Sequence, residues 1–241
     1  MAAQQGRWRA ATFLLLLFLL FAELAFADPT GGTISSATTE YATNRTPDSR
    51  ADPRSTITTM LLSTIQQDQH WKAYVGNVSG SLTLDDAANF TIYDWDLTTI
   101  SGQVYASRYG NLSWSSVSCA TGADVTSESF FHNMTNADSD DINSTFNWST
   151  HKAFSIGSNT IGANSCNSTV TYANDTRQVP TAASPFQEVL IKDANNYLVY
   201  MTGIDDNVQG FDNQTYDFQM IVAESAIKGS PTTYYFYVEL R

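Results

Sequence analysis

The sequence predicts an all-β fold, namely a single β-sandwich of immunoglobulin-like or jelly-roll-like type with an extended N-terminal segment. Short runs of alternating apolar and polar residues recur through most of the 241 residues, as in strands that bury one face. Turn-forming residues separate these runs. No long helical pattern interrupts them, so about ten to twelve short strands are expected.

The first 27 residues have the three parts of a secretory signal peptide. Arg7 and Arg9 precede an apolar run over 11–21, and Ala25-Phe26-Ala27 supplies the small residues of a cleavage site. A retained membrane anchor is the alternative, but the run is short and Glu23 interrupts it. Neither a later membrane span nor a lipid-anchor signal is apparent. We therefore expect a secreted protein, extracellular or on the cell surface, with no membrane anchor after cleavage.

The mature chain is strongly acidic. Cleavage reduces twelve basic residues to ten and twenty-four acidic residues to twenty-three, so the formal charge moves from −12 to −13. Nucleic acid and anionic membrane surfaces are therefore excluded as partners, because both need clustered Lys and Arg. Cys119 and Cys166 are the two cysteines. After export they are expected to form a disulfide worth on the order of 4 kcal/mol, with two buried thiols as the alternative.

The segment after the signal peptide divides into two parts. Residues 28–54 are rich in Thr, Ser and Pro, and are expected to be a flexible linker. Residues 55–70 are expected to contain an N-terminal strand, although helical spacing also fits, because Thr and β-branched residues favour a strand. Its apolar positions are Ile57, Met60, Leu61, Leu62 and Ile65.

Residues 71–241 are expected to form the sandwich. In 71–95 three strands are separated by a Gly turn and a polar turn, with Leu82, Leu84, Phe90 and Ile92 on buried faces. Thr121 to Asn147 is expected to be a long loop with at most one helical turn. The remaining predicted strands are 102–107, 112–117, 152–156, 168–172, 188–192, 197–201, 216–222 and 234–240.

Ten Asn-x-Ser/Thr sequons predict heavy N-glycosylation. Chance in a chain of this composition gives about four. Coincidence is the alternative. The asparagines are Asn44, Asn77, Asn89, Asn111, Asn133, Asn143, Asn147, Asn167, Asn174 and Asn213.

Three intervals contain no sequon, namely 45–76, 175–212 and 214–241. A face that contacts another protein must be free of glycans, so these intervals are candidates for an interface. The alternative is that buried strands exclude sequons. For 55–65 the interface interpretation is favoured, because an apolar strand on a flexible linker suits pairing with a neighbouring sheet.

No catalytic site is apparent, and we expect no enzyme. His70, His132 and His151 lie in no known catalytic or metal-binding motif. Two carboxylates paired as in a glycosidase remain the alternative. The oxygen-rich stretches 136–141 and 205–207 lack the pattern of a calcium-binding loop. We expect no metal or cofactor beyond N-linked glycans, with a structural Ca²⁺ as the alternative to solvated loops.

Several aromatic residues are candidates for stacking on sugars, as in a carbohydrate-binding module. They are Trp95, Trp114, Trp148, Tyr235 and Tyr237. Core or cross-strand packing is the more common role of such residues in β-rich chains.

Several ordered blocks resemble a group of uncharacterised exported proteins of archaea and some bacteria. The blocks are Trp71-Lys-Ala-Tyr-Val-Gly-Asn-Val-Ser-Gly80, Ile92-Tyr-Asp-Trp95, Gly102-Gln-Val-Tyr-Ala-Ser107, Gly210-Phe-Asp212, Tyr216-Asp-Phe-Gln-Met220 and Tyr234-Tyr-Phe-Tyr237. The resemblance covers about residues 71–241. It implies a surface glycoprotein, and with it a subunit of glycosylated filaments joined by N-terminal strand exchange.

These observations lead to one expected function and one alternative. The chain is expected to be a structural subunit of a glycosylated filament, a helical homo-oligomer. Each N-terminal strand would complete the sheet of the next copy head-to-tail. The alternative is a secreted β-sandwich module that binds carbohydrate or protein.

Overall fold

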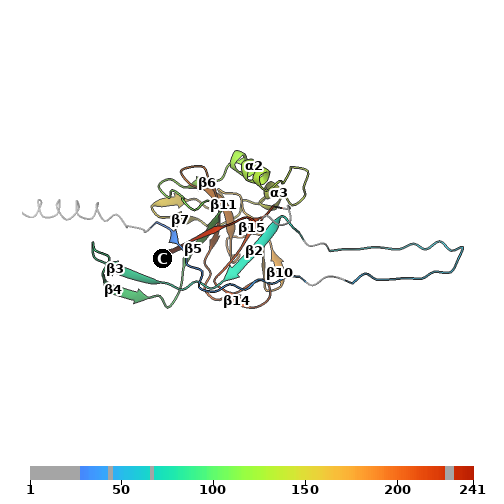
Figure 1. Ribbon diagram of the computed structural model, residues 1–241, viewed down its shortest axis with the longest axis horizontal. Coiled ribbons are helices and arrows are strands. Elements are labelled where there is room, and N and C mark those ends of the chain that lie inside the picture. Colours follow the sequence, from blue (N-terminus) through green and yellow to red (C-terminus); the bar gives the residue numbers. More distant parts are fainter. Residues whose placement is uncertain (1–27, 43–45, 66–67, 226–230) are drawn as a thin grey trace, which may run out of the picture.

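A computed structural model describes residues 28–42, 46–65, 68–225 and 231–241 (Figure 1). The predicted signal peptide and Asn44 lie outside the described residues. The predicted all-β class is confirmed, since strands far outnumber helices in the described part of the chain. A single sandwich is not confirmed, because one six-stranded sheet stands beside several two-stranded ones.

The largest sheet is antiparallel and forms the centre of the body (Figure 1). Its strands are, in spatial order, β1 (Thr30–Gly31), β16 (Tyr235–Leu240), β5 (Gly102–Ser107), β12 (Leu198–Gly203), β11 (Glu188–Lys192) and β6 (Ser118–Cys119). The middle strands β5, β12 and β11 are almost wholly buried. Their near-continuous apolar runs are therefore explained by burial on both faces.

Each face of this sheet has its own apolar core. On one face Tyr200 packs in a cluster with Val222 of β15 (Phe218–Ala223). Strand β15 pairs with β2 (Trp71–Gly76) in a two-stranded sheet. On the other face Tyr105 packs with Ile156, which lies in the hairpin of β7 (Phe154–Ile156) and β8 (Asn159–Ile161). The body is thus three-layered, with unequal layers.

The prediction of a long loop over 121–147 is wrong in part, because this segment contains helix α2 (Gly122–Phe131) and a short α3 (Ile142–Thr145). The Asp124 carboxylate accepts hydrogen bonds from the Thr121 backbone N–H (2.8 Å) and hydroxyl (2.5 Å). Such a cap satisfies the helix N-terminus. The helix leaves Phe130 and Phe131 exposed, and buries only Val125, Glu128 and Ser129. The sequence therefore lacked the apolar stripe that usually identifies a helix.

The smaller strands form short hairpins. They are β3 (Ser81–Asp85) with β4 (Thr91–Asp96), β9 (Thr171–Ala173) with β10 (Thr176–Gln178), and β13 (Val208–Gln209) with β14 (Thr215–Tyr216). The predicted strand 112–117 does not form. Trp114 and Val117 are nevertheless buried there, so the apolar pattern reflected burial of an irregular segment.

The predicted disulfide is confirmed between Cys119 and Cys166, whose Cα atoms are 4.9 Å apart. It joins the end of β6 to the loop that follows β8. The described helices include none that is long and apolar enough to cross a bilayer.

The N-terminal segment differs from the expectation at both ends. Residues 30–31, predicted to lie in a linker, form β1 against Tyr237 and Val238 of β16. The Gly32 N–H extends this pairing to the Phe236 carbonyl at 2.9 Å. The predicted strand in 55–65 is absent from the single chain, because no described strand runs beside it.

Candidate functional site

Residues 46–65, here called the arm, project from the body opposite the β3–β4 hairpin (Figure 1). The chain runs outward to a turn at 53–56 and then returns toward β2. The Thr56 hydroxyl donates to the Pro53 carbonyl at 2.8 Å across this turn. Near the tip Arg50 and Asp52 form an exposed ion pair at 2.9 Å. These contacts are local, so they leave the return limb uncovered.

The return limb carries all five residues that were predicted to mediate self-assembly. They are Ile57, Met60, Leu61, Leu62 and Ile65. Their exposure ranges from 55% for Met60 to 101% for Ile57. A run of large apolar side chains in water is costly, so these side chains are a candidate interaction surface.

The sequon asparagines are accessible. Of the nine that the structure describes, Asn167 is half-buried and the other eight are exposed. Four of them, at Asn89, Asn133, Asn174 and Asn213, adopt the left-handed backbone conformation of turns, which Asn tolerates better than most residues. Accessibility is necessary for glycan attachment, and glycosylation itself stays a prediction.

Burial separates the two interpretations of the sequon-free intervals. The intervals 175–212 and 214–241 contain the buried strands β11, β12 and β15 together with β16. Burial therefore accounts for the lack of sequons in β11, β12 and β15. The arm is exposed at every residue and still contains no sequon. Burial does not explain this lack of sequons, so the interface interpretation remains for the arm.

The β3–β4 hairpin is an exposed apolar surface that the sequence analysis missed. The prediction of burial is wrong for Leu82, Leu84, Phe90 and Ile92, because all four are exposed. Alternation of apolar and polar residues shows that a strand has two different faces, but does not show what covers the apolar one. Nothing in the sequence pattern distinguished this hairpin from the core strands.

The three histidines are held by hydrogen bonds of the fold. The buried His151 ring accepts at Nε2 from the Ser165 and Cys166 backbone N–H groups, at 3.0 and 2.9 Å. Its Nδ1 then donates to the Lys152 carbonyl at 2.6 Å, which requires the neutral ring. His132 is buried beside Glu128, 3.3 Å from its carboxylate. These are structural roles.

The acidic stretch 136–141 does not converge on one centre. Asp138 accepts from the Thr135 N–H at 2.7 Å, and Asp141 caps α3 through the Ser144 N–H at 2.6 Å. Asp140 instead faces His70, with the carboxylate 2.6 Å from Nδ1. Asp68 lies beside them, and the three ligand atoms are within 4.8 Å of one another.

The group of Asp68, His70 and Asp140 is half-open to solvent at the base of the arm. Burial is the main cause that raises the pKa of Asp68. Burial also acts to raise the pKa of Asp140, but hydrogen bonds from His70 and Asp68 outweigh it and lower that pKa. The group satisfies its own hydrogen bonds. The second predicted oxygen cluster is also engaged, since Asp205 accepts from the Phe186 N–H at 2.7 Å.

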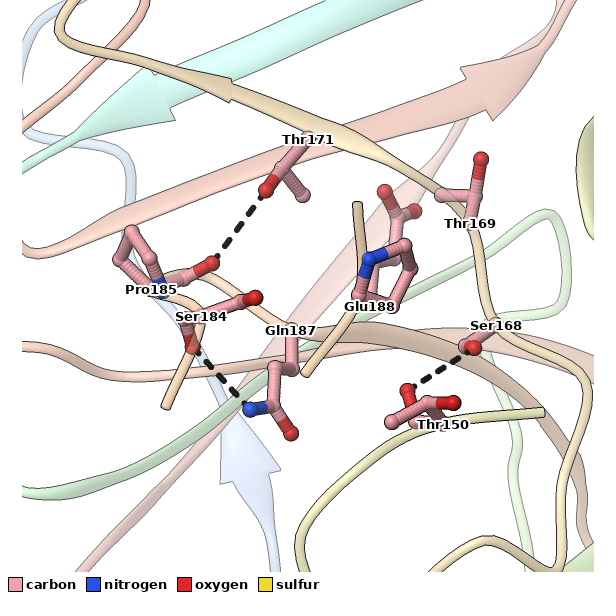
Figure 2. Close-up of a pocket in the computed structure, with 9 residues that line it drawn as sticks. Thr150, Ser168, Thr169, Thr171, Ser184, Pro185, Gln187 and Glu188 are labelled. Atoms are coloured by element: carbon pink, nitrogen blue, oxygen red, sulfur yellow. Dashed lines mark hydrogen bonds between the residues drawn. The ribbon is translucent and has the colours of Figure 1, made fainter. Parts of the chain in front are cut away.

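The buried Glu188 lies in the enclosed polar region of Figure 2. The neighbouring hydroxyls of Ser168 and Thr171 point to the backbone carbonyls of Thr150 and Pro185. The region leaves no space for even a water molecule. A more open depression of about 170 Å³ lies near His151, whose ring nitrogens are already engaged.

Two of the five candidate sugar-stacking aromatics, Trp114 and Tyr237, pack against other rings, whereas Trp95 and Tyr235 are exposed. Trp114 is buried between Tyr105 and Tyr237, at ring-centroid distances of 5.0 and 5.4 Å. Trp95 is exposed on the β3–β4 hairpin, 4.8 Å from the ring of Tyr93.

Comparison with protein-family models, with curated proteins and with solved structures found no match.

Proposed function

We propose that this chain is a non-enzymatic structural subunit of a glycosylated filament outside the cell or on its surface. Copies assemble head-to-tail when the arm of one subunit adds a strand to the next. The observation that carries this proposal is the arm itself, which exposes five large apolar side chains and no sequon. A disulfide accords with an exported protein.

Available strand edges support this mode of assembly. Among the described residues β2 pairs with β15 alone, and β3 and β4 pair only with each other. The outer edge of β16 is covered at two residues by β1. An unpaired edge offers backbone N–H and C=O groups to a strand from another chain. Head-to-tail contacts of this kind do not close, so they build fibres.

The test is to remove the apolar side chains of the arm while keeping β1. The variant Ile57→Ser/Leu61→Ser/Leu62→Ser is expected to secrete as a folded monomer, since it alters no side chain of the body. Negative-stain microscopy and size-exclusion chromatography measure assembly. A matched control, Thr56→Ser/Thr58→Ser/Thr59→Ser, is expected to form filaments. Unaltered filaments of the apolar-to-Ser variant would contradict the proposal.

Glycosylation is tested separately by the intact mass of the secreted protein. Enzymatic or chemical deglycosylation is expected to lower the mass by several glycans. An unshifted mass would remove glycosylation from the proposal and leave strand complementation untouched.

A second candidate function is a carbohydrate-binding module. The exposed Tyr93–Trp95 pair favours it, because adjacent aromatic rings stack on sugars. A glycan array with the monomeric arm variant tests it, with Trp95→Ala as the control expected to lose binding. Absence of any bound glycan would exclude this candidate.

A further inference from the structure

The β3–β4 hairpin has one apolar face. Its register places Leu82 opposite Trp95 and Leu84 opposite Tyr93. Directly opposed residues of an antiparallel pair share a face, so these four side chains form one surface, here called the hairpin face. Each of them is between 44% and 58% exposed. The hairpin stands apart from the body (Figure 1).

Such a hairpin is incomplete as a structural unit. An isolated two-stranded hairpin is at best marginally stable in water, and needs a third strand or a covering layer. Among the described residues no strand pairs with the outer edge of β3 or β4. The hairpin face therefore has both an uncovered apolar surface and free edges for a further strand.

The charges around the hairpin limit what can cover it. Asp85, Asp86, Asp94 and Asp96 lie in or beside its strands, and no Lys or Arg occurs between 81 and 96. An acidic segment or an anionic lipid surface is repelled by this arrangement. The covering segment must be apolar, extended, and neutral or basic.

The return limb of the arm has these properties. Residues 54–65 contain no acidic residue, and Arg54 supplies a positive charge at their start. Ile57, Leu61 and Ile65 lie at even spacing, so in a strand they share one face. The arm and the hairpin project from opposite ends of the molecule (Figure 1). A contact between them therefore joins two copies.

We propose that the β3–β4 hairpin is the receptor for residues 54–65 of a second copy, which pair as a third strand with one of its unpaired edges, next to the hairpin face. Ile57, Leu61 and Ile65 of the incoming copy extend the hairpin face, and Arg54 lies near its carboxylates. This inference rests on the proposed strand complementation and specifies its acceptor. Because donor and receptor are different surfaces, two bound copies still have one free donor and one free receptor. Further copies can therefore add at both ends.

The experiment uses two full-length variants with complementary defects. One is the arm variant Ile57→Ser/Leu61→Ser/Leu62→Ser, which keeps its hairpin. The other is Leu84→Ser/Trp95→Ser, which keeps its arm. Ser81→Ala/Thr83→Ala on the opposite face of the hairpin is the matched control and is expected to form filaments. Circular dichroism and thermal unfolding confirm that each variant retains its body.

Each defective variant alone is expected to be a monomer. Mixed at equal concentrations, they are expected to form a dimer and nothing larger, because only one donor and one receptor remain intact in the pair. Its association is expected to be on the order of 100-fold tighter than the self-association of either variant. Analytical ultracentrifugation measures both.

Three results overturn the inference, and they differ in what they leave of the proposed function. If Leu84→Ser/Trp95→Ser assembles into filaments while the arm variant does not, or if two monomeric variants give no dimer, the hairpin is not the receptor and the donor role of the arm stands. If the arm variant also assembles, both the receptor and the proposed function fail.

Discussion

At the scale of single residues, Glu188 is the most unusual side chain of the body. It is 1% exposed, and its Oε2 accepts the Ile221 N–H at 3.0 Å. Its Oε1 has no hydrogen-bond partner among the described residues. Burial raises the pKa of Glu188 well above its ordinary value of 4.5, and only the Ile221 hydrogen bond opposes this. The folded protein therefore favours the protonated carboxyl.

This shift predicts how stability depends on pH. As pH rises above 4.5, Glu188 ionises in the unfolded chain but stays protonated in the folded one, so the free energy of unfolding falls until pH passes the folded pKa. Each unit by which the pKa is raised costs about 1.4 kcal/mol. Glu188→Gln is expected to remove this fall and to raise stability at pH 7. Urea denaturation from pH 4 to 8 measures it.

Glu224 serves as the control, because its pKa moves in the opposite direction. Burial acts to raise that pKa, but hydrogen bonds from Lys72 and Thr232 outweigh it and lower the pKa. Its contribution to stability is present above the ordinary pKa and lost as pH falls. Glu224→Gln is therefore expected to destabilise at neutral pH. If Glu188→Gln tracked the wild type at every pH, the assignment of a neutral carboxyl would be wrong.

At the scale of elements, α2 depends on its cap. The Asp124 carboxylate holds the Thr121 N–H and hydroxyl, and also lies 3.2 Å from Lys192 Nζ. Burial acts to raise the pKa of Asp124, but these hydrogen bonds outweigh it and lower the pKa. The cap links the helix to β11.

Removing this cap is expected to weaken the helix at neutral pH. Asp124→Ala is expected to lower the free energy of unfolding by about 1 kcal/mol. The loss should disappear as pH falls, because protonated Asp124 contributes less in the wild type. The mid-helix control Ser127→Ala is expected to be neutral. An equal effect of both substitutions would show that the cap is unimportant.

The disulfide constrains the irregular half of the body. Cys119 ends β6, and Cys166 follows a loop whose backbone His151 holds. Cys119→Ser/Cys166→Ser is expected to lose roughly 2–5 kcal/mol of stability, because a cross-link over a separation of 47 residues restricts the unfolded chain. Thermal unfolding measures the loss, with reduced wild type as the comparison. Equal midpoints for oxidised protein and double variant would contradict it.

At the scale of the whole molecule, a three-layered body carries extensions at opposite ends (Figure 1). The body buries its apolar residues in two clusters, whereas both extensions leave theirs exposed. A chain that completes its own core but not its extensions is suited to linear assembly.

Assembly is expected to protect the arm from proteolysis. In the monomer, trypsin should cut rapidly after Arg54, which is exposed at the turn of the arm. In assembled filaments this cleavage should slow by on the order of 100-fold or more, since strand pairing removes the site from the protease. Mass spectrometry of timed digests measures it. Lys152, exposed on the body, is the internal control, and equal protection at both sites would point to filament bundling instead.

The sequence predicted those parts of the fold that local chemistry controls. Alternating apolar and polar residues identified β16, because the side-chain period of a strand is fixed by its backbone. Short runs of strand-forming residues between turns identified β5, β11 and β12. Two cysteines after a predicted signal peptide identified the disulfide. The apolar residues of the arm are exposed, and the strand expected there does not form in the single chain.

Only the tertiary structure decided which apolar faces are covered. Leu82 and Tyr105 both belong to predicted strands, yet Leu82 is exposed on a free hairpin and Tyr105 is buried between two layers. The sequence of α2 became a helix through its cap and its packing on β12. Strand period is local, whereas burial depends on segments far apart in the chain. The sequence by itself therefore determined the central strands and the disulfide, and the fold determined which apolar surfaces are exposed.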